Sequence, residues 1–354
     1  MTADKYVAFD VHDATTVAVV RDASGDVIAE SVLKTRPEPI SDFLRGLSGR
    51  VALAFEEGTH AAWLVDLTTP LACTVIVANA RKLPRARKQP KSDRIDATLL
   101  SELLFLRRLS PVFHDHASVR RLKHLVRVYA QLVADASRLK NRFKALFRSR
   151  ALACHGQALF APERRALRLA ELPDDGARLR AELVGRALDA LRPVLADAKR
   201  ALCREARRHP AYPLLCSVPG FGPIRSSVVI ATIVTPHRFR RDRQLWAYAG
   251  LSVVTHSSAD HQITPDGIRR RPKAVHTRGL TADFNRPLKA ALKGAALAAS
   301  RTDPFAARYQ RLLDRGLRPE IAQVVIARSL ASCLLALWKK GERFDPAKLT
   351  HETR

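Results

Sequence analysis

The chain has 354 residues, enough for two or three domains, and 47% of them are apolar, which argues against global disorder. Its formal net charge is +27, an excess that opposes compaction unless a polyanion neutralises it. Nucleic acid is the first candidate partner, because Lys and Arg bound to phosphates release condensed counterions, and an anionic membrane surface is the second. The N-terminus lacks the apolar stretch of a signal peptide and no apolar run approaches the roughly 20 residues of a spanning helix, so we expect a cytoplasmic protein without membrane contact. Five cysteines without paired spacing argue against disulfides or a zinc knuckle.

The first 80 residues alternate short apolar runs with turn and helix signals. Tyr6–Val11, Thr16–Val20 and Val27–Leu33 read as three antiparallel strands. Helices are expected near 39–47 and 59–69, and buried strands at 51–55 and 74–77. Three antiparallel strands followed by alternating helices and parallel strands predict an α/β domain with a mixed sheet. That order fits a ribonuclease H-like (RuvC-like) fold, and it also fits actin-like ATPases.

A basic, proline-broken loop and a helix follow. We expect the loop to contact nucleic acid on the strength of its charge alone, through Arg85, Arg87, Lys88 and Lys91. The helix begins near Ser92, and its apolar stripe is predicted to be Ile95, Leu99, Leu103 and Leu106.

Residues 118–148 carry the clearest periodic signal. Spacings of three and four predict a heptad seam made of Leu122, Leu125, Tyr129, Leu132, Ala136, Leu139, Phe143 and Leu146. A second stretch, 177–207, repeats leucines at 179, 183, 191, 195 and 202, and Pro193 should kink or break it. We therefore predict a helical coiled-coil hairpin, with an ordinary helical bundle as the alternative. Basic residues on its outer face, which include Lys140, Arg142 and Lys144, are expected to bind nucleic acid.

The last third is predicted to be mostly α. Val218–Pro223, with the sequence VPGFGP, resembles a helix-hairpin-helix turn whose glycines, Gly220 and Gly222, would let backbone N–H groups approach a phosphate. Residues 319–340 should form an amphipathic closing helix.

Acidic residues stand at the ends of predicted strands. Asp10 ends the first strand, and Glu56 and Glu57 end the central one. Asp93 and Asp96 lie three apart on a helix, so they share a face. Hard oxygen ligands gathered from distant segments are what a pair of Mg²⁺ ions needs for in-line phosphoryl transfer.

Two adjacent serines, Ser257 and Ser258, follow the aromatic-rich segment 243–251, and cations that include Arg270 and Arg271 lie downstream. A serine beside cations near DNA can attack a phosphodiester, although hydroxyls in a loop are commonly only caps.

These segments together resemble the DEDD-type insertion-sequence transposases, the Piv-like recombinases guided by a bridge RNA. The resemblance runs over nearly the whole chain and is most specific in the string KSDRIDA. It is carried by residues 7–12 (VAFDVH), 55–60 (FEEGTH) with Trp63, 91–97 (KSDRIDA), 217–223 (SVPGFGP), Phe239 with 244–251 (QLWAYAGL), and 343–346 (RFDP).

The resemblance implies roles for particular residues. The family's metal-binding acids fall on Asp10, Glu56, Asp93 and Asp96, with Glu57 a rival for the second position. The family's catalytic serine, usually followed by glycine, falls on Ser258, but here the next residue is alanine, which leaves Ser257 open.

The resemblance also implies a structured guide RNA, DNA of the element ends and target, and a dimer that pairs into a tetramer on DNA. In that assembly, a composite active site forms between protomers.

We therefore expect a RuvC-like DEDD domain at 1–112, a coiled-coil hairpin at 113–208 and a C-terminal transposase domain at 209–354. The expected function is Mg²⁺-dependent strand cleavage and rejoining through a serine. The alternative is a hydrolytic nuclease or junction resolvase of the same fold. The sequence lacks the later Gly-rich segments of actin-like ATPases, which argues against that class. A non-enzymatic RNA-binding coiled-coil protein would not need the four acids.

Overall fold

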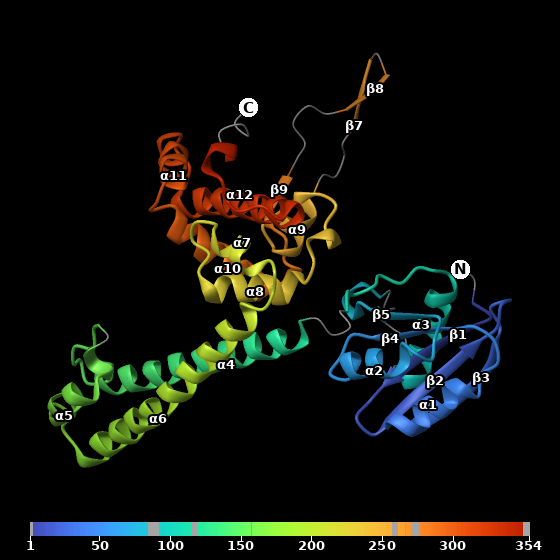
Figure 1. Ribbon diagram of the computed structural model, residues 1–354, viewed down its shortest axis with the longest axis horizontal. Coiled ribbons are helices and arrows are strands. Elements are labelled where there is room, and N and C mark those ends of the chain that lie inside the picture. Colours follow the sequence, from blue (N-terminus) through green and yellow to red (C-terminus); the bar gives the residue numbers. More distant parts are fainter. Residues whose placement is uncertain are drawn as a thin grey trace. The chain divides into compact units, whose positions relative to one another are not determined.

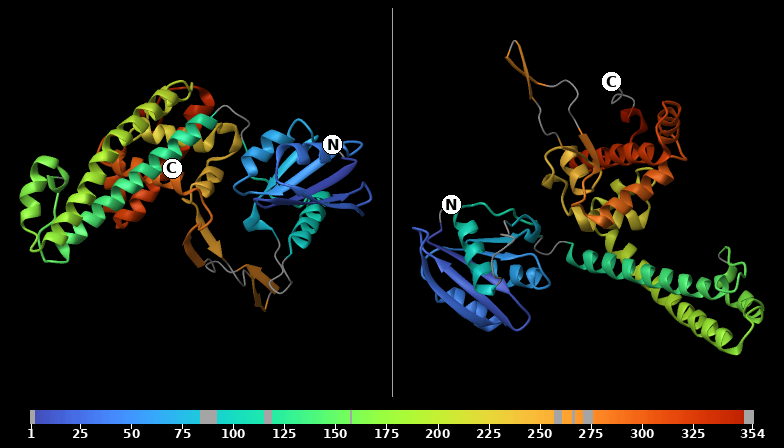
Figure 2. Two further views of the ribbon diagram at one scale, coloured as in Figure 1. Left: turned by 90° about the horizontal axis from the view of Figure 1, so that it is seen from below. Right: turned by 180° about the vertical axis from the view of Figure 1, so that it is seen from behind.

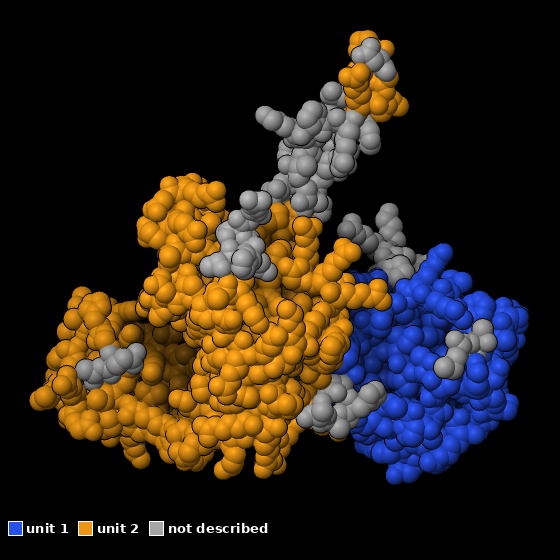
Figure 3. All heavy atoms as spheres, turned by 45° about the horizontal axis from the view of Figure 1, so that its top comes forward, with its two compact units in different colours: residues 1–118 blue, residues 119–354 orange. Residues whose placement is uncertain are grey.

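A computed structural model divides the chain into two compact units, residues 1–118 and 119–354 (Figure 3). The predicted border between 113–208 and 209–354 falls inside the second unit and stays a prediction. The structure describes residues 3–83, 92–114, 119–156, 158–256, 261–265, 267–270 and 276–349.

Unit 1 contains the predicted mixed sheet, with strand order β3-β2-β1-β4-β5 (Figure 1). The first three strands pair antiparallel, and β1–β4 and β4–β5 pair parallel. Antiparallel strands at one edge and parallel strands at the other fit a ribonuclease H-like domain. The strands are β1 (Lys5–Val11), β2 (Thr15–Arg21), β3 (Val27–Lys34), β4 (Val51–Glu56) and β5 (Thr74–Ala78).

Helices cover both faces of this sheet. Helices α1 (Pro37–Arg45) and α2 (Ala61–Thr68) pack on the face that carries Phe9 and Phe55. Helix α3 (Asp93–Phe105) packs on the opposite face, over Ala8 and the other small side chains of the central strands. Strands covered on both sides read as continuous apolar runs, which is why the sequence revealed them.

The predicted stripe of α3 was wrong at its two ends, whereas Leu103 is buried and Leu99 is half-buried. Ile95 is 41% exposed and Leu106, just beyond the helix, is 44% exposed. The buried side of the helix carries Ala97, Leu100, Ser101, Leu103 and Leu104, and two of these five side chains are small. Small side chains let the helix approach a flat sheet closely.

Unit 2 is mainly helical, as predicted for this part of the chain. Its long helices α4 and α6 lie side by side, with α5 at their connection (Figures 1 and 2). The helices of the unit are α4 (Arg120–Arg148), α5 (Pro162–Ala170), α6 (Asp175–Ala206), α7 (Tyr212–Cys216), α8 (Pro223–Ile233), α9 (Asp242–Tyr248), α10 (Arg286–Ala299), α11 (Phe305–Asp314) and α12 (Pro319–Lys340).

The α4–α6 pair is a helical hairpin. The predicted seam of α4 is its less exposed side, with Phe143 and Leu146 buried. The predicted stripe of α6 was wrong in its first half, because Leu179 and Leu183 are 57% and 53% exposed. Helix α6 also continues through Pro193 instead of breaking there. Whether the pair is a coiled coil stays a prediction.

The rest of unit 2 forms one apolar core around α8, α10 and α12. Helix α12 is, among the described residues, the one helix long and apolar enough to cross a membrane, so its apolar run is longer than we expected. More than half of that apolar window is buried, in contact with α10, α11 and α9, which accounts for its composition.

Four short strands complete unit 2. They form two antiparallel pairs, β6 with β9 and β7 with β8. Their bounds are Val253–His256 for β6, His261–Thr264 for β7, Gly267–Arg270 for β8 and His276–Leu280 for β9.

Candidate functional site

Two of the predicted acids lie at the same edge of the unit 1 sheet. The parallel register pairs Phe9 of β1 with Phe55 of β4, so Asp10 and Glu56 follow side by side. Both line one pocket of about 140 Å³. Strand alternation puts them on the face of Ala8 and Ala54, which α3 covers.

The other two acids come from the first turn of α3. The Ser92 hydroxyl caps this helix by accepting a hydrogen bond from the Ile95 N–H, at 3.3 Å. Asp93 and Asp96 then stand where the helix dipole favours negative charge. Arg94 between them forms an ion pair with Glu30 of β3, with 2.6 Å between Nε and Oε2. The turn is therefore tied to the sheet.

Electrostatics link these acids to each other. Burial raises the pKa of the Asp10 carboxyl, the negative charges of Asp93 and Asp96 act in the same direction, and His12 opposes them. An oxygen of Asp10, one of Asp93 and a ring nitrogen of His12 all lie within 4.8 Å of one another. The structure thus brings Asp10 close to Asp93 and within electrostatic reach of Asp96, with Glu56 beside it in the pocket.

Hard carboxylate oxygens on a half-buried floor are suitable ligands for a divalent cation. The donor set therefore fits a divalent metal.

Glu57 lines the same pocket, so proximity alone does not remove it as a rival. Its side chain is exposed, and it stands one position beyond Glu56 along the strand direction. Strand β4 ends at Glu56, and if alternation continued by one residue Glu57 would fall on the face of Phe55, away from α3.

His12 was not among the site residues predicted from the sequence. The signal was present, because residues 10 and 12 differ by two positions and so project to the same side of an extended chain. The side chain of His12 is 52% exposed, and its Nε2 contacts both Asp10 and Asp93.

Comparisons with known proteins identify the family. A family model described as "Transposase", that of the IS110 DEDD transposases, matches residues 7–150. A second, described as "Transposase IS116/IS110/IS902 family", matches residues 212–310. The chain belongs to the IS110 family of DEDD transposases. The first match contains all four acids and the second contains both serines.

A curated relative is the insertion element IS110 uncharacterized 43.6 kDa protein of Streptomyces coelicolor. It is 28% identical over 170 residues, which cover 45% of this chain and 39% of the relative. The chain thus matches about two fifths of that relative's length.

In this transposase-family chain, the serine candidates lie outside the described residues. Strand β6 ends at His256, immediately before Ser257 and Ser258. Its partner β9 returns toward α10. Arg271 also lies outside the described residues, and of Arg270 only the backbone, in β8, is described.

The basic residues predicted to bind nucleic acid are described only in part. Arg85, Arg87, Lys88 and Lys91 lie outside the described residues. On α4, Arg142 is exposed, whereas the ammonium groups of Lys140 and Lys144 lie 5.4 and 5.6 Å from the centre of the Phe160 ring. These two lysines therefore also pack on the hairpin.

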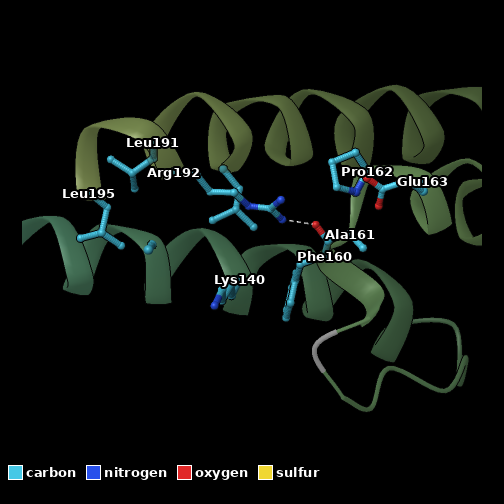
Figure 4. Close-up of a pocket in the computed structure, with 10 residues that line it drawn as sticks. Lys140, Phe160, Ala161, Pro162, Glu163, Leu191, Arg192 and Leu195 are labelled. Carbon is cyan, nitrogen blue, oxygen red and sulfur yellow. Dashed lines mark hydrogen bonds between the residues drawn. The ribbon is translucent and has the colours of Figure 1, made fainter. Parts of the chain in front are cut away.

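Lys140 also lines a pocket of about 370 Å³ between α4, α5 and α6 (Figure 4). Arg192 enters it from α6 and donates a hydrogen bond to the carbonyl oxygen of Phe160. Its remaining lining is mostly apolar, with Glu163 as the one acid. One carboxylate cannot build a two-metal site, so the metal site is expected in unit 1.

The two glycines of the predicted helix-hairpin-helix turn differ in their surroundings. Gly220 has a φ of +82°, and a Cβ there would lie 2.3 Å from the carbonyl oxygen of Ala295 on α10. Gly222 is the N-cap of α8, and a Cβ there would meet nothing within 4 Å. Packing against α10 therefore explains Gly220, and nothing near Gly222 requires a glycine.

Proposed function

We propose that this chain is the transposase of an insertion sequence and that it cuts and rejoins DNA strands with Mg²⁺ held by Asp10, Glu56, Asp93 and Asp96. The observation that carries the proposal is the convergence of acids from β1, β4 and α3 at one edge of the sheet. Family membership supports action on DNA.

The four carboxylates would together coordinate the metal. When bound, a pair of Mg²⁺ ions supplies activation of the attacking group and stabilisation of the leaving oxygen. The chain's own contribution is positional. Asp10 and Glu56 are fixed by the strand register, while Asp93 and Asp96 are fixed by the capped first turn of α3 and by the ion pair between Arg94 and Glu30.

The proposed nucleophile is Ser258, with Ser257 as the alternative. Its hydroxyl would lose a proton and form an Oγ–P bond, the bond from phosphorus to the oxygen of one DNA strand would break, and that strand would take up a proton and leave with a free hydroxyl. A phosphoserine link conserves the bond energy, so rejoining to a new strand needs no ATP. The support for this step is the family resemblance and the position of both serines directly after β6.

The proposed partners are polyanions and further copies of this chain. A net charge of +27 suits DNA of the element ends and target together with a structured guide RNA. The α4–α6 hairpin, as a coiled coil, would serve in a dimer that pairs into a tetramer on DNA. Such a protein would work in the cytoplasm, on the nucleoid when it is bound to DNA.

Cleavage of DNA that carries the element ends tests the metal site. We expect Asp10→Asn and Asp96→Ala to abolish cleavage while the circular dichroism spectrum stays that of the wild type. Asp42→Asn is the matched control, because Asp42 is an exposed acid on α1, which covers the opposite face of the sheet. Full activity of Asp96→Ala would refute the assignment.

Trapping of a covalent adduct separates the transposase from its alternative, a hydrolytic nuclease or junction resolvase. We expect a denaturant-resistant protein–DNA adduct in the wild type with guide RNA and Mg²⁺, and neither adduct nor cleavage in Ser258→Ala. Cleavage by Ser258→Ala at the wild-type rate, with no adduct in the wild type, would favour hydrolysis. An adduct that persists in Ser258→Ala and vanishes in Ser257→Ala would move the role to Ser257.

A further inference from the structure

The imidazole of His12 lies between two of the acids. Its Nε2 is 3.3 Å from Oδ2 of Asp10 and 3.4 Å from Oδ1 of Asp93. A surface histidine without a role in the site would not need to contact acids from two separate segments of the chain. Its ring nitrogen instead belongs to the same cluster of donor atoms as the two carboxylates.

The backbone holds His12 in this place. The His12 N–H donates to the carbonyl oxygen of Thr15 at 2.9 Å, which closes the turn between β1 and β2. The Thr35 hydroxyl donates to the carbonyl oxygen of His12 at 2.8 Å. Thr35 is 4% exposed and its oxygen lies 2.9 Å from the hydroxyl oxygen of the fully buried Thr16. The ring is therefore carried by an ordered turn.

The spacing of the three donor atoms is that of ligands on one ion. Adjacent ligands of an octahedral ion with bonds of 2.0–2.1 Å lie about 3 Å apart, and opposite ligands about 4 Å apart. The distances from His12 Nε2 to the two carboxylate oxygens are close to the first value, and the upper bound of 4.8 Å on all three separations accommodates either arrangement.

We propose that His12 is a ligand of the metal site, so that this transposase binds its ion through one nitrogen as well as carboxylate oxygens. The inference rests on the proposed metal-dependent function and adds a donor to the four acids. The tautomer with its proton on Nδ1 leaves the Nε2 lone pair free for the ion.

A nitrogen ligand changes which ions the site prefers. Mg²⁺ is suited by carboxylate and water oxygens, whereas imidazole suits the transition ions, whose affinity for nitrogen sites rises from Mn²⁺ through Co²⁺. We therefore expect tighter binding of Mn²⁺ and Co²⁺ than of Mg²⁺, and we expect that preference to depend on His12.

His60 provides a matched control within the same unit. It lines the pocket that contains Asp10 and Glu56, but its Nε2 lies 3.6 Å from Asp13, an acid outside the predicted set of four. Removal of His60 deletes a nearby imidazole without deleting a proposed ligand.

The test is Mn²⁺ binding to the full-length protein, followed by electron paramagnetic resonance, with electron spin echo modulation to detect a directly coordinated ¹⁴N. We expect ¹⁴N modulation in the wild type and in His60→Ala and none in His12→Ala. We also expect His12→Ala to weaken Mn²⁺ binding by at least about tenfold and Mg²⁺ binding by less. Because the side chain of His12 is 52% exposed, the variant should fold normally.

Each result has a distinct meaning. Wild-type Mn²⁺ binding that is lost in Asp10→Asn but shows no ¹⁴N modulation would overturn the His12 assignment and leave the proposed function standing. Tighter Mn²⁺ binding by His12→Ala would also overturn it, because the imidazole would then occupy the ion's place and exclude it. No Mn²⁺ binding by the wild type, or equal binding by Asp10→Asn, would refute the metal site of the proposed function itself.

Discussion

Replacement of Gly220 by alanine tests whether the VPGFGP turn is a packing element. Alanine at a φ of +82° costs about 1–2 kcal/mol of backbone strain. Its Cβ would also lie 2.3 Å from the carbonyl oxygen of Ala295, which cannot move unless α10 shifts, and such overpacking costs about 1–3 kcal/mol. We therefore expect Gly220→Ala to lower the free energy of unfolding by roughly 2–5 kcal/mol.

Gly222→Ala is the control two residues away. Its Cβ would meet open space at a φ of −84°, so only the loss of a glycine N-cap, at most about 1 kcal/mol, is expected. Urea unfolding followed by tryptophan fluorescence, with Trp63 of unit 1 replaced by Phe in every variant, would report on unit 2, which contains Trp246 and Trp338. Equal midpoints for Gly220→Ala and the wild type would refute the packing argument. Wild-type stability combined with lost DNA affinity would instead assign Gly220 to the nucleic-acid interface.

Two further predictions concern the α4–α6 hairpin. Asp189→Asn should destabilise it by about 2–3 kcal/mol, because the buried Arg165 guanidinium loses its bidentate counterion. The hydrogen bond and the positive charge of Arg165 lower the pKa of Asp189. Its contribution to the free energy of unfolding should therefore be present above its ordinary pKa of 3.8 and be lost as pH falls through the lowered pKa. Urea unfolding at pH 7 and pH 3 would show whether the stability difference between the wild type and Asp189→Asn shrinks in acid. Arg142→Gln should reduce the slope of log K for DNA against log salt by close to one unit without changing stability. Lys140→Gln and Lys144→Gln should each reduce the slope and also lower the free energy of unfolding by about 0.5–1 kcal/mol, because the contact with the Phe160 ring is lost. An unchanged slope when all three charges are removed would contradict a binding role for α4.

The strands of unit 1 and the helices of unit 2 could be predicted because each buries an apolar pattern of its own period. The apolar runs of β1 and β4 are covered on both faces, and α4 repeats its seam for the length of the hairpin. Such local patterns need no knowledge of the partner element.

The errors in the two helix stripes share one physical cause, which is that small residues mark the closest contacts. The buried stripe of α3 uses Ala97 and Ser101, and Ser101 accepts a hydrogen bond from Arg21 of β2 at 2.9 Å. In α6, Gly185 leaves room for the Arg165 side chain, whose Nε would lie 2.7 Å from a Cβ at that position. Because these positions carry small side chains, the pattern of large apolar residues did not include them, and it predicted Leu179, which lies on the exposed face.

The choice between Glu56 and Glu57 shows what the sequence could not decide. Both follow the same apolar run, and both line the pocket beside Asp10. A linear pattern does not say which face of the sheet a helix from a later segment will cover. Once α3 is known to pack over Ala8 and Ala54, the period of two along each strand puts Asp10 and Glu56 on its side. Glu57, one step further, falls on the side of α1 and α2, so Glu56→Gln should remove cleavage and Glu57→Gln should retain it. The reverse result would mean that the chain leaves strand geometry after Glu56 and turns the second acid toward the metal.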